Sequence, residues 1–230
     1  MTHGSACQDL DSFAKCERKM VPPAQYVDNR DRPMVLARCG RGKRAKRLLD
    51  LALAWLLMPL LLPLMAVIAV LLKLTSKGSA LYWSDRIGRN NTTFRMPKFR
   101  TMRMDTPTVA THMLSSAERY VTPVGSLLRK TSLDELPQVF SVIVGHMSFV
   151  GPRPALFNQE DLVALRTERG AHQLLPGITG WAQVNGRDEL PIPIKVRFDE
   201  EYLRRRSFSF DLKILMMTAI RVLRGEGVSH

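Results

Sequence analysis

Residues 51–72, LALAWLLMPLLLPLMAVIAVLL, form the longest uncharged stretch of the chain. A helix of about 20 apolar residues is long enough for the ~30 Å hydrocarbon core of a bilayer, so the stretch predicts a membrane helix. Pro59 and Pro63 lie inside it, and an internal proline removes a backbone hydrogen bond and clashes with the preceding turn. We therefore expect a bend near these prolines, with Pro63 as its expected position.

Basic residues flank the apolar stretch on both sides. They are Arg41, Lys43, Arg44, Lys46 and Arg47 before it, and Lys73, Lys77, Arg86 and Arg89 after it. Because Lys and Arg favour the cytoplasmic side of a membrane, both ends are expected there. The bent helix is then re-entrant, entering and leaving by one face. An ordinary kinked transmembrane helix is the alternative that the residues leave open.

The composition fits one domain with a hydrophobic core, because the chain has 230 residues of which 45% are hydrophobic. A formal net charge of +13 predicts anionic partners: nucleic acid, anionic lipid headgroups or phosphorylated substrates. The three cysteines, Cys7, Cys16 and Cys39, lack the spacing of a zinc site or a disulfide framework. We expect them to be reduced, as in the cytoplasm.

The chain divides into three predicted segments and an α+β fold. Residues 1–40 are polar and are expected to be flexible, residues 41–73 hold the basic flank and the membrane helix, and residues 74–230 form a soluble domain. The soluble part opens with two short strands around an Asn90-Asn91 turn, a β-hairpin studded with basic residues. Pro97 is expected to kink its edge strand.

The last helix is predicted to be amphipathic. Asp211 is its expected N-cap and Gly225 its C-terminal stop. Its apolar stripe comprises Leu212, Leu215, Met216, Ala219, Ile220 and Leu223. Such a stripe packs on a domain core or lies on a membrane surface, and the sequence leaves both open.

Two adjacent carboxylates, Asp134 and Glu135, stand in RKTSLDELPQVF. One interpretation is a capping box, in which Ser132 and Glu135 cap the start of a helix. Pro137 weakens it, because a proline five positions after the cap falls beyond the first turn. The other interpretation is a carboxylate nucleophile with a helper, in which cations such as Arg129 and Arg153, with a divalent metal, neutralise phosphate oxygens.

Two further stretches could serve a phosphorylated ligand. Arg153 stands between two prolines in GPRP, which restricts the backbone around its guanidinium, although a rigid loop with a solvated arginine fits equally. The stretch PGITGWAQVNGR combines glycines with Gln183 and Arg187 and contains no P-loop or dinucleotide fingerprint. The histidines are dispersed without metal-ligand spacing.

Six strings in one order resemble the bacterial sugar transferase family, the monotopic polyprenyl-phosphate phosphoglycosyl transferases. Beside the proline-containing helix, they are KRLLD, KFRTMRMD, TPVGSLLRKTSLDELPQ, MSFVGPRP, PGITGWAQVNGR and DLKIL. The resemblance covers about residues 46–227. It implies a small catalytic domain held on the cytoplasmic face of the bacterial inner membrane by the re-entrant helix and by amphipathic surface helices.

The resemblance also implies a reaction. Asp134 attacks the diphosphate of a UDP-sugar, releases UMP and holds the sugar phosphate covalently, while Glu135 assists. Polyprenyl phosphate, usually undecaprenyl phosphate, then takes the sugar phosphate, as a first membrane step of surface glycan synthesis such as exopolysaccharide or O-antigen. Mg²⁺ is the implied cofactor, bound at Asp134. The implied substrate-binding residues are Lys98, Arg100, Arg129, Arg153, Gln183 and Arg187.

The expected partners are therefore UDP-sugar, polyprenyl phosphate and membrane lipid, without nucleic acid, and a homodimer is left open. Two other classes remain as alternatives. A membrane-tethered basic adaptor would bind nucleic acid or anionic lipid without chemistry. A membrane phosphatase using the same aspartate would release sugar phosphate to water.

Overall fold

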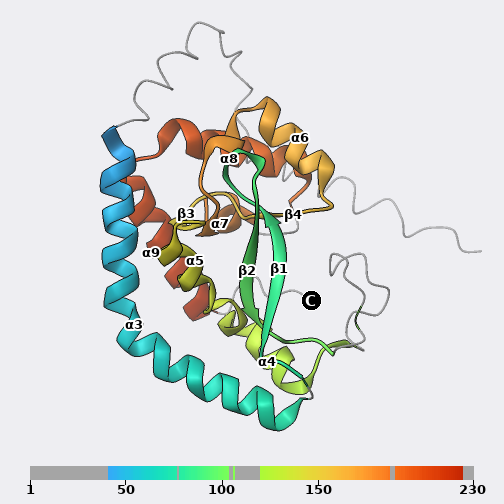
Figure 1. Cartoon of the computed structure of the whole chain (residues 1–230). Helices are drawn as coiled ribbons and strands as arrows, with labels where there is room; N and C mark the ends of the chain where they lie inside the picture. The colour runs from blue at the N-terminus through green and yellow to red at the C-terminus, as the bar shows by residue number, and fades with distance from the viewer. Residues whose placement is uncertain (1–40, 77, 104–105, 107–119, 187–189, 225–230) are drawn as a thin grey trace, which may run out of the picture. The chain divides into compact units, whose positions relative to one another are not determined.

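The computed structural model describes residues 41–76, 78–103, 106, 120–186 and 190–224 (Figure 1). The expected flexible segment 1–40, its three cysteines, the expected stop at Gly225 and the candidate Arg187 lie outside these residues. Within them the chain combines helices with short strands and one long apolar helix, as expected for an α+β fold.

Helix α3, Arg41–Thr75, contains both prolines, and its segment 44–75 is long and apolar enough to cross a membrane. In Figure 1 the helix is not straight, because its blue first part stands upright and its cyan last part runs obliquely below the domain. One face is exposed along its length and carries Leu56, Leu60 and Leu64, while Met58 and Met65 are buried. A helix with so much exposed apolar surface makes membrane association plausible.

The predicted hairpin is confirmed. Strand β1, Leu81–Ile87, pairs antiparallel with β2, Thr93–Phe99, in the register Leu81↔Phe99. The connection contains the 3-10 turn Arg89–Asn91, in which Asn90 and Asn91 have positive φ angles of 54° and 60°. Asparagine tolerates this left-handed conformation better than most residues, which is why the Asn-Asn pair marks the turn.

Strand β4, Ala155–Leu156, pairs with the other side of β1, so β2 is an edge strand of the three-stranded sheet. Pro97 lies within β2 opposite Trp83. An edge strand accepts a proline because only one side of it forms ladder hydrogen bonds. The hairpin remains continuous through Pro97 over the whole register.

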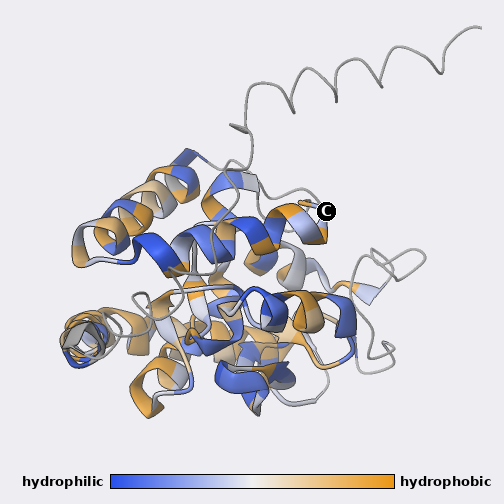
Figure 2. Cartoon of the chain, turned by 90° about the horizontal axis from the view of Figure 1, so that it is seen from above, coloured by the Kyte–Doolittle hydropathy of each residue, from blue (hydrophilic) through white to orange (hydrophobic). Residues whose placement is uncertain are grey.

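A second, parallel sheet consists of β3, Ser148–Val150, and β5, Gly177–Thr179. The helices around the sheets are α4 (Pro123–Lys130), α5 (Gln138–Val144), α6 (Glu160–Glu168), α7 (Gln183–Gly186), α8 (Ile192–Arg205) and α9 (Phe208–Arg224). Short 3-10 turns at Leu133–Glu135 and Ala171–Gln173 complete the described elements. Viewed from above, many of the helices carry apolar and polar residues in alternating patches (Figure 2).

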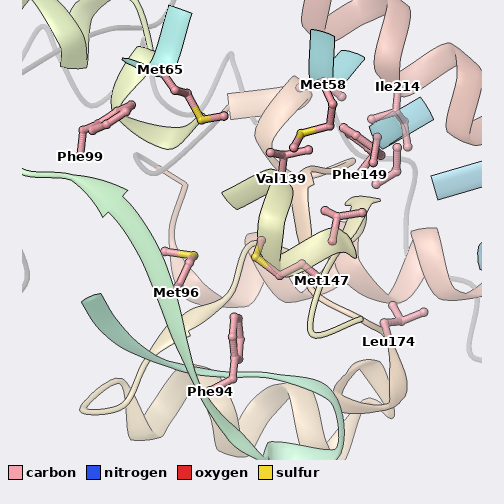
Figure 3. Close-up of a cluster of buried hydrophobic side chains, with 14 of the residues drawn as sticks. Met58, Met65, Phe94, Met96, Phe99, Val139, Met147, Phe149, Leu174 and Ile214 are labelled. Atoms are coloured by element: carbon pink, nitrogen blue, oxygen red, sulfur yellow. The ribbon is translucent and has the colours of Figure 1, made fainter. Parts of the chain in front are cut away.

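The core joins the long helix to the domain. Met58 and Met65 of α3 belong to the same buried cluster as Met96 of β2, Val139 of α5 and Ile214 of α9 (Figure 3). Each fully buried side chain of this size stabilises the fold by about 1.5–3 kcal/mol. Because α3 contributes to this cluster, its buried face is part of the domain's hydrophobic core.

Polar contacts fix the first turns of α3 on the domain. The Lys46 ammonium lies 2.6 Å from Asp211, and Arg47 donates to the last carbonyls of α5, at Val142 and Ile143. Asp50 is buried and accepts from the Ser148 hydroxyl and the Phe149 amide, each at 3.1 Å. Two of the basic residues in the predicted flank therefore contact protein.

The predicted N-cap of the last helix is wrong. Helix α9 begins at Phe208, and the Ser207 hydroxyl accepts from the Phe210 amide at 3.2 Å. Asp211 lies within the first turn and is buried, where it accepts a hydrogen bond from Tyr202 at 2.7 Å in addition to its pair with Lys46. The helix packs mainly through Phe210 and Ile214.

The predicted apolar stripe of α9 divides between interior and surface. Leu212, Met216 and Ile220 are exposed, whereas Leu215 is partly buried against the core. The helix therefore packs on the domain with one face and presents apolar side chains on another.

Candidate active site

Asp134 and Glu135 lie in the 3-10 turn Leu133–Glu135, between α4 and α5. Ser132 precedes the turn in the left-handed region, at a φ of 56°, and its side chain forms no cap hydrogen bond. The capping-box interpretation is therefore wrong. Pro137 is accommodated because it is the N-cap of α5, ahead of the first helical residue.

Glu135 is held by two cations from distant segments. Lys98 at the end of β2 and Arg153 in the GPRP loop both contact the same Glu135 oxygen, Oε1, at 2.7 Å and 3.0 Å. Burial alone would raise the pKa of Glu135, but Arg153 and Lys98 outweigh it and hold that pKa well below its usual range. Glu135 is therefore a fixed negative charge that orients both cations.

The pKa of Asp134 is shifted in the opposite direction to that of Glu135. The Asp134 side chain is buried, and within the described residues no hydrogen bond is formed to its carboxylate. Burial raises the pKa of Asp134 above its ordinary value, the charge of Glu135 adds to the rise, and Lys98, Arg129 and Arg153 oppose it. The two neighbouring carboxylates are thus distinct: one is neutralised by ion pairs and the other is left short of compensating charge.

Arg129 brings a third cation to the site from the last turn of α4. Its Nε donates to the Thr101 hydroxyl at 2.9 Å. Burial lowers the pKa of Arg129, and the charge of Asp134 opposes this. The start of α4 is fixed nearby, because Gly125 packs so closely on the Thr101 carbonyl that an added Cβ would lie 2.1 Å from its oxygen.

The structure brings together Lys98, Arg129 and Arg153 around the carboxylates. The Arg100 amide donates to the Ala80 carbonyl at 2.8 Å. Gln183 begins α7 and donates to the Ile178 carbonyl at 3.2 Å. Their roles remain predictions.

Two residues at the site were not anticipated from the sequence. Thr101 lies inside the KFRTM string, so its place beside the basic residues of that motif was the available signal. Arg166 donates to the backbone carbonyl of Arg153 at 2.9 Å. In the sequence ALRTERG it looks like any solvated residue of a polar helix, and no local pattern reveals its long-range contact.

The site can accommodate a divalent cation only in a restricted way. Among the described residues no group of three His, Cys, Asp or Glu side chains could hold a metal ion. Mg²⁺, however, commonly binds through one or two carboxylates and takes its other ligands from water and substrate phosphates. Asp134, a buried carboxylate without full charge compensation, fits that mode of binding.

The arrangement as a whole suits an anionic substrate. The charges of Lys98, Arg129 and Arg153 all act on Asp134, whose carboxylate accepts no hydrogen bond from the described residues, so the cations can neutralise phosphate oxygens while that carboxylate attacks phosphorus. A carboxylate in such surroundings can act as a nucleophile.

Comparison with known proteins places these residues in a defined group. Residues 41–225 match the model of a family described as "Bacterial sugar transferase", a range that contains every candidate site residue. The "UDP-glucose:undecaprenyl-phosphate glucose-1-phosphate transferase" of Xanthomonas campestris pv. campestris is 41% identical over 187 residues, which are 78% of this chain and 39% of that protein.

Two other relatives differ in their names and lengths. The "UDP-N-acetylgalactosamine-undecaprenyl-phosphate N-acetylgalactosaminephosphotransferase" of Aeromonas hydrophila is 36% identical over 188 residues, 79% of this chain and 44% of that protein. The "Uncharacterized sugar transferase EpsL" of Bacillus subtilis (strain 168) is 40% identical over 190 residues, 80% of this chain and 90% of that protein. The chain thus spans about two fifths of the length of the two relatives named for their substrates.

Asp134→Asn is expected to stabilise the fold at about pH 7.5. Because its pKa is raised on folding, ionised Asp134 costs stability, and this cost grows as the pH rises through the window between the ordinary Asp pKa and the raised one. The variant should melt at a higher temperature, by about 2–4 °C for each kcal/mol relieved. The difference should shrink toward about pH 4, where the wild-type carboxyl gains its proton.

Thermal melting in detergent across this pH range measures the effect. Asp85→Asn is the matched control, because Asp85 is exposed in β1 and pairs only loosely with Arg95 at 3.7 Å. A lower melting temperature for Asp134→Asn than for wild type at about pH 7.5 would contradict the assignment of a burial cost to Asp134.

Proposed function

The chain belongs to the bacterial sugar transferase family, and from that premise we propose that it transfers a sugar 1-phosphate from a UDP-sugar to undecaprenyl phosphate, releasing UMP. The observation that carries the proposal is that two adjacent carboxylates have different surroundings. Glu135 is engaged by Lys98 and Arg153, while Asp134 is buried beside them and accepts no hydrogen bond within the part of the chain that the structure describes. A site that only attracted anions would not need the second carboxylate at its centre.

In the first step, an Asp134 oxygen forms a bond to the phosphorus that bears the sugar. The bond between that phosphorus and the bridging oxygen breaks, and UMP leaves with the bonding electrons. A sugar phosphate is left covalently on Asp134 as an acyl phosphate. No proton has to move, because the negative charge of the carboxylate is transferred to the departing UMP.

In the second step, a phosphate oxygen of undecaprenyl phosphate attacks the same phosphorus. The acyl phosphate bond breaks, Asp134 is regenerated as a carboxylate, and the product is a polyprenyl diphosphate sugar. Both steps bring an anion to an anion, which the surrounding cations make feasible. Glu135 contributes by keeping Lys98 and Arg153 at the reaction centre.

Mg²⁺ is the proposed cofactor, and Asp134 is the residue that would hold it. When bound, a divalent cation neutralises diphosphate oxygens and so supplies the charge compensation that the buried Asp134 lacks. The substrate-binding roles of Arg100, Gln183 and Arg187 belong to the same proposal.

We also propose the cytoplasmic face of the bacterial inner membrane as the location. The exposed apolar face of α3 supports insertion, and the basic residues at both of its ends support a re-entrant course. Pro59 and Pro63 lie in the middle of α3, and Pro63 is the proposed bend. The pathway would be synthesis of a surface glycan, consistent with relatives named for exopolysaccharide production.

Asp134→Asn is expected to lower UMP release by on the order of 10³-fold or more, because an amide cannot replace the nucleophile. The assay scores a panel of UDP-sugars, including UDP-glucose and UDP-N-acetylgalactosamine, with undecaprenyl phosphate. Without acceptor, wild-type enzyme should release at most one UMP per chain and gain the mass of the sugar phosphate on the peptide that contains Asp134. Asp85→Asn serves as control.

Robust turnover by Asp134→Asn would refute this mechanism. Continued release of sugar phosphate into water, without need of the lipid, would indicate a phosphatase. Absence of any reaction, combined with steeply salt-dependent binding to nucleic acid, would indicate a basic adaptor.

Chelation of divalent ions with EDTA is expected to reduce UMP release to background, and added Mg²⁺ should restore it. The melting temperature of the substrate-free enzyme should change little, because a metal held by one carboxylate and substrate phosphates contributes little without substrate. Full activity in EDTA would remove Mg²⁺ from the proposal.

The membrane topology is tested by labelling with a membrane-impermeant maleimide. Ala45→Cys and Ser79→Cys stand just outside the apolar stretch, in a chain whose Cys7, Cys16 and Cys39 are replaced by serine. Both positions should react only after the cells are opened. Labelling of Ser79→Cys in intact spheroplasts would show instead that α3 crosses the membrane.

A further inference from the structure

The Pro-Arg-Pro loop that carries Arg153 is fixed through three consecutive carbonyl groups. The Pro152 carbonyl accepts from the Gly177 amide at 2.9 Å, the Arg153 carbonyl from Arg166 at 2.9 Å, and the Pro154 carbonyl from Arg86 at 3.4 Å. Prolines have no N–H, so within this loop only Arg153 could donate a backbone hydrogen bond. The carbonyls therefore determine where the loop lies.

Arg166 supplies the contact to the Arg153 carbonyl. It belongs to α6, and its side chain is buried. Nη1 donates to the Arg153 carbonyl, while Nε and Nη2 approach a single Asp199 oxygen at 2.8 Å and 2.7 Å. The rigid guanidinium thus links Asp199 of α8 to the backbone of the loop.

The buried Arg166–Asp199 ion pair is not explained by its contribution to stability. Asp199 is 2% exposed, and taking both charges out of water costs about as much as their attraction returns. Apolar residues of similar volume often give equal stability. What apolar residues cannot give is a donor at a fixed distance from the Arg153 carbonyl.

We propose that Arg166, held by Asp199, is a positioning residue that fixes the Arg153 guanidinium on Glu135. The connection runs from Asp199 through the Arg166 fork to the Arg153 carbonyl, and from the Arg153 side chain to Glu135 Oε1 at 3.0 Å. The catalytic part of this inference rests on the proposed function, because Arg153 would there contact the diphosphate.

Arg166→Lys separates this role from folding. Lysine keeps the positive charge beside Asp199 but has no fork to reach the Arg153 carbonyl at the same time. We expect kcat/KM, measured by UMP release with the best UDP-sugar of the panel, to fall on the order of 10- to 100-fold. In an Arg153→Lys background the same change should alter kcat/KM by less than about twofold, because the effect passes through Arg153.

Two further variants control for stability. The double variant Arg166→Met, Asp199→Leu replaces the pair by apolar residues and should keep the fold. Its kcat/KM should fall as far as that of Arg166→Lys. Arg169→Gln removes another ion pair, which joins the C-cap residue of α6 to Glu200 of α8 at 3.6 Å and does not involve the loop. It should leave kcat/KM unchanged.

Hydrogen–deuterium exchange gives a readout that does not depend on activity. The peptide covering residues 151–157 should exchange faster in Arg166→Lys than in wild type and should be unchanged in Arg169→Gln. Unchanged exchange in Arg166→Lys, or activity losses that multiply with those of Arg153→Lys, would overturn the proposal. If the wild type releases no UMP from any UDP-sugar, the proposed function fails, and the exchange result still decides whether Arg166 positions the loop.

Discussion

The structure depends on the long apolar helix α3, which has one face in the protein core and another apolar face on the surface. One face of α3 is buried with β2, α5 and α9 in a common core, and another face exposes leucines that water does not favour. Lys46, Arg47 and Asp50 add polar contacts to three separate parts of the domain. The helix is therefore a core element of the domain that also exposes an apolar face.

A second constraint is electrostatic. Adjacent carboxylates repel each other, and burial makes both costly to ionise. The fold resolves this by pairing both Lys98 and Arg153 with Glu135, while the same cations act on Asp134 only through their charge. The asymmetry comes from tertiary contacts, because the two cations belong to segments on either side of the 3-10 turn in sequence.

The elements that could be predicted from sequence are those with local signals. The hairpin followed from Asn90 and Asn91, whose turn chemistry acts over four residues. The capping box failed because Ser-x-x-Glu is the same string whether Glu135 caps a helix or binds distant cations. The N-cap at Asp211 failed for the same reason, since the carboxylate pairs with Lys46. Arg166 and Asp50 escaped notice because an isolated charge carries no sign of a buried partner.

The Pro-Arg-Pro loop has a thermodynamic consequence. Ordering a flexible arginine at the moment of binding would subtract its lost side-chain and backbone entropy from the affinity for substrate. Here the two prolines restrict the backbone even in the unfolded chain, and the carbonyl contacts complete the ordering during folding. The entropy is thus lost when the protein folds and lowers the stability of the fold. It is not lost again when a ligand binds, because Arg153 is already in place.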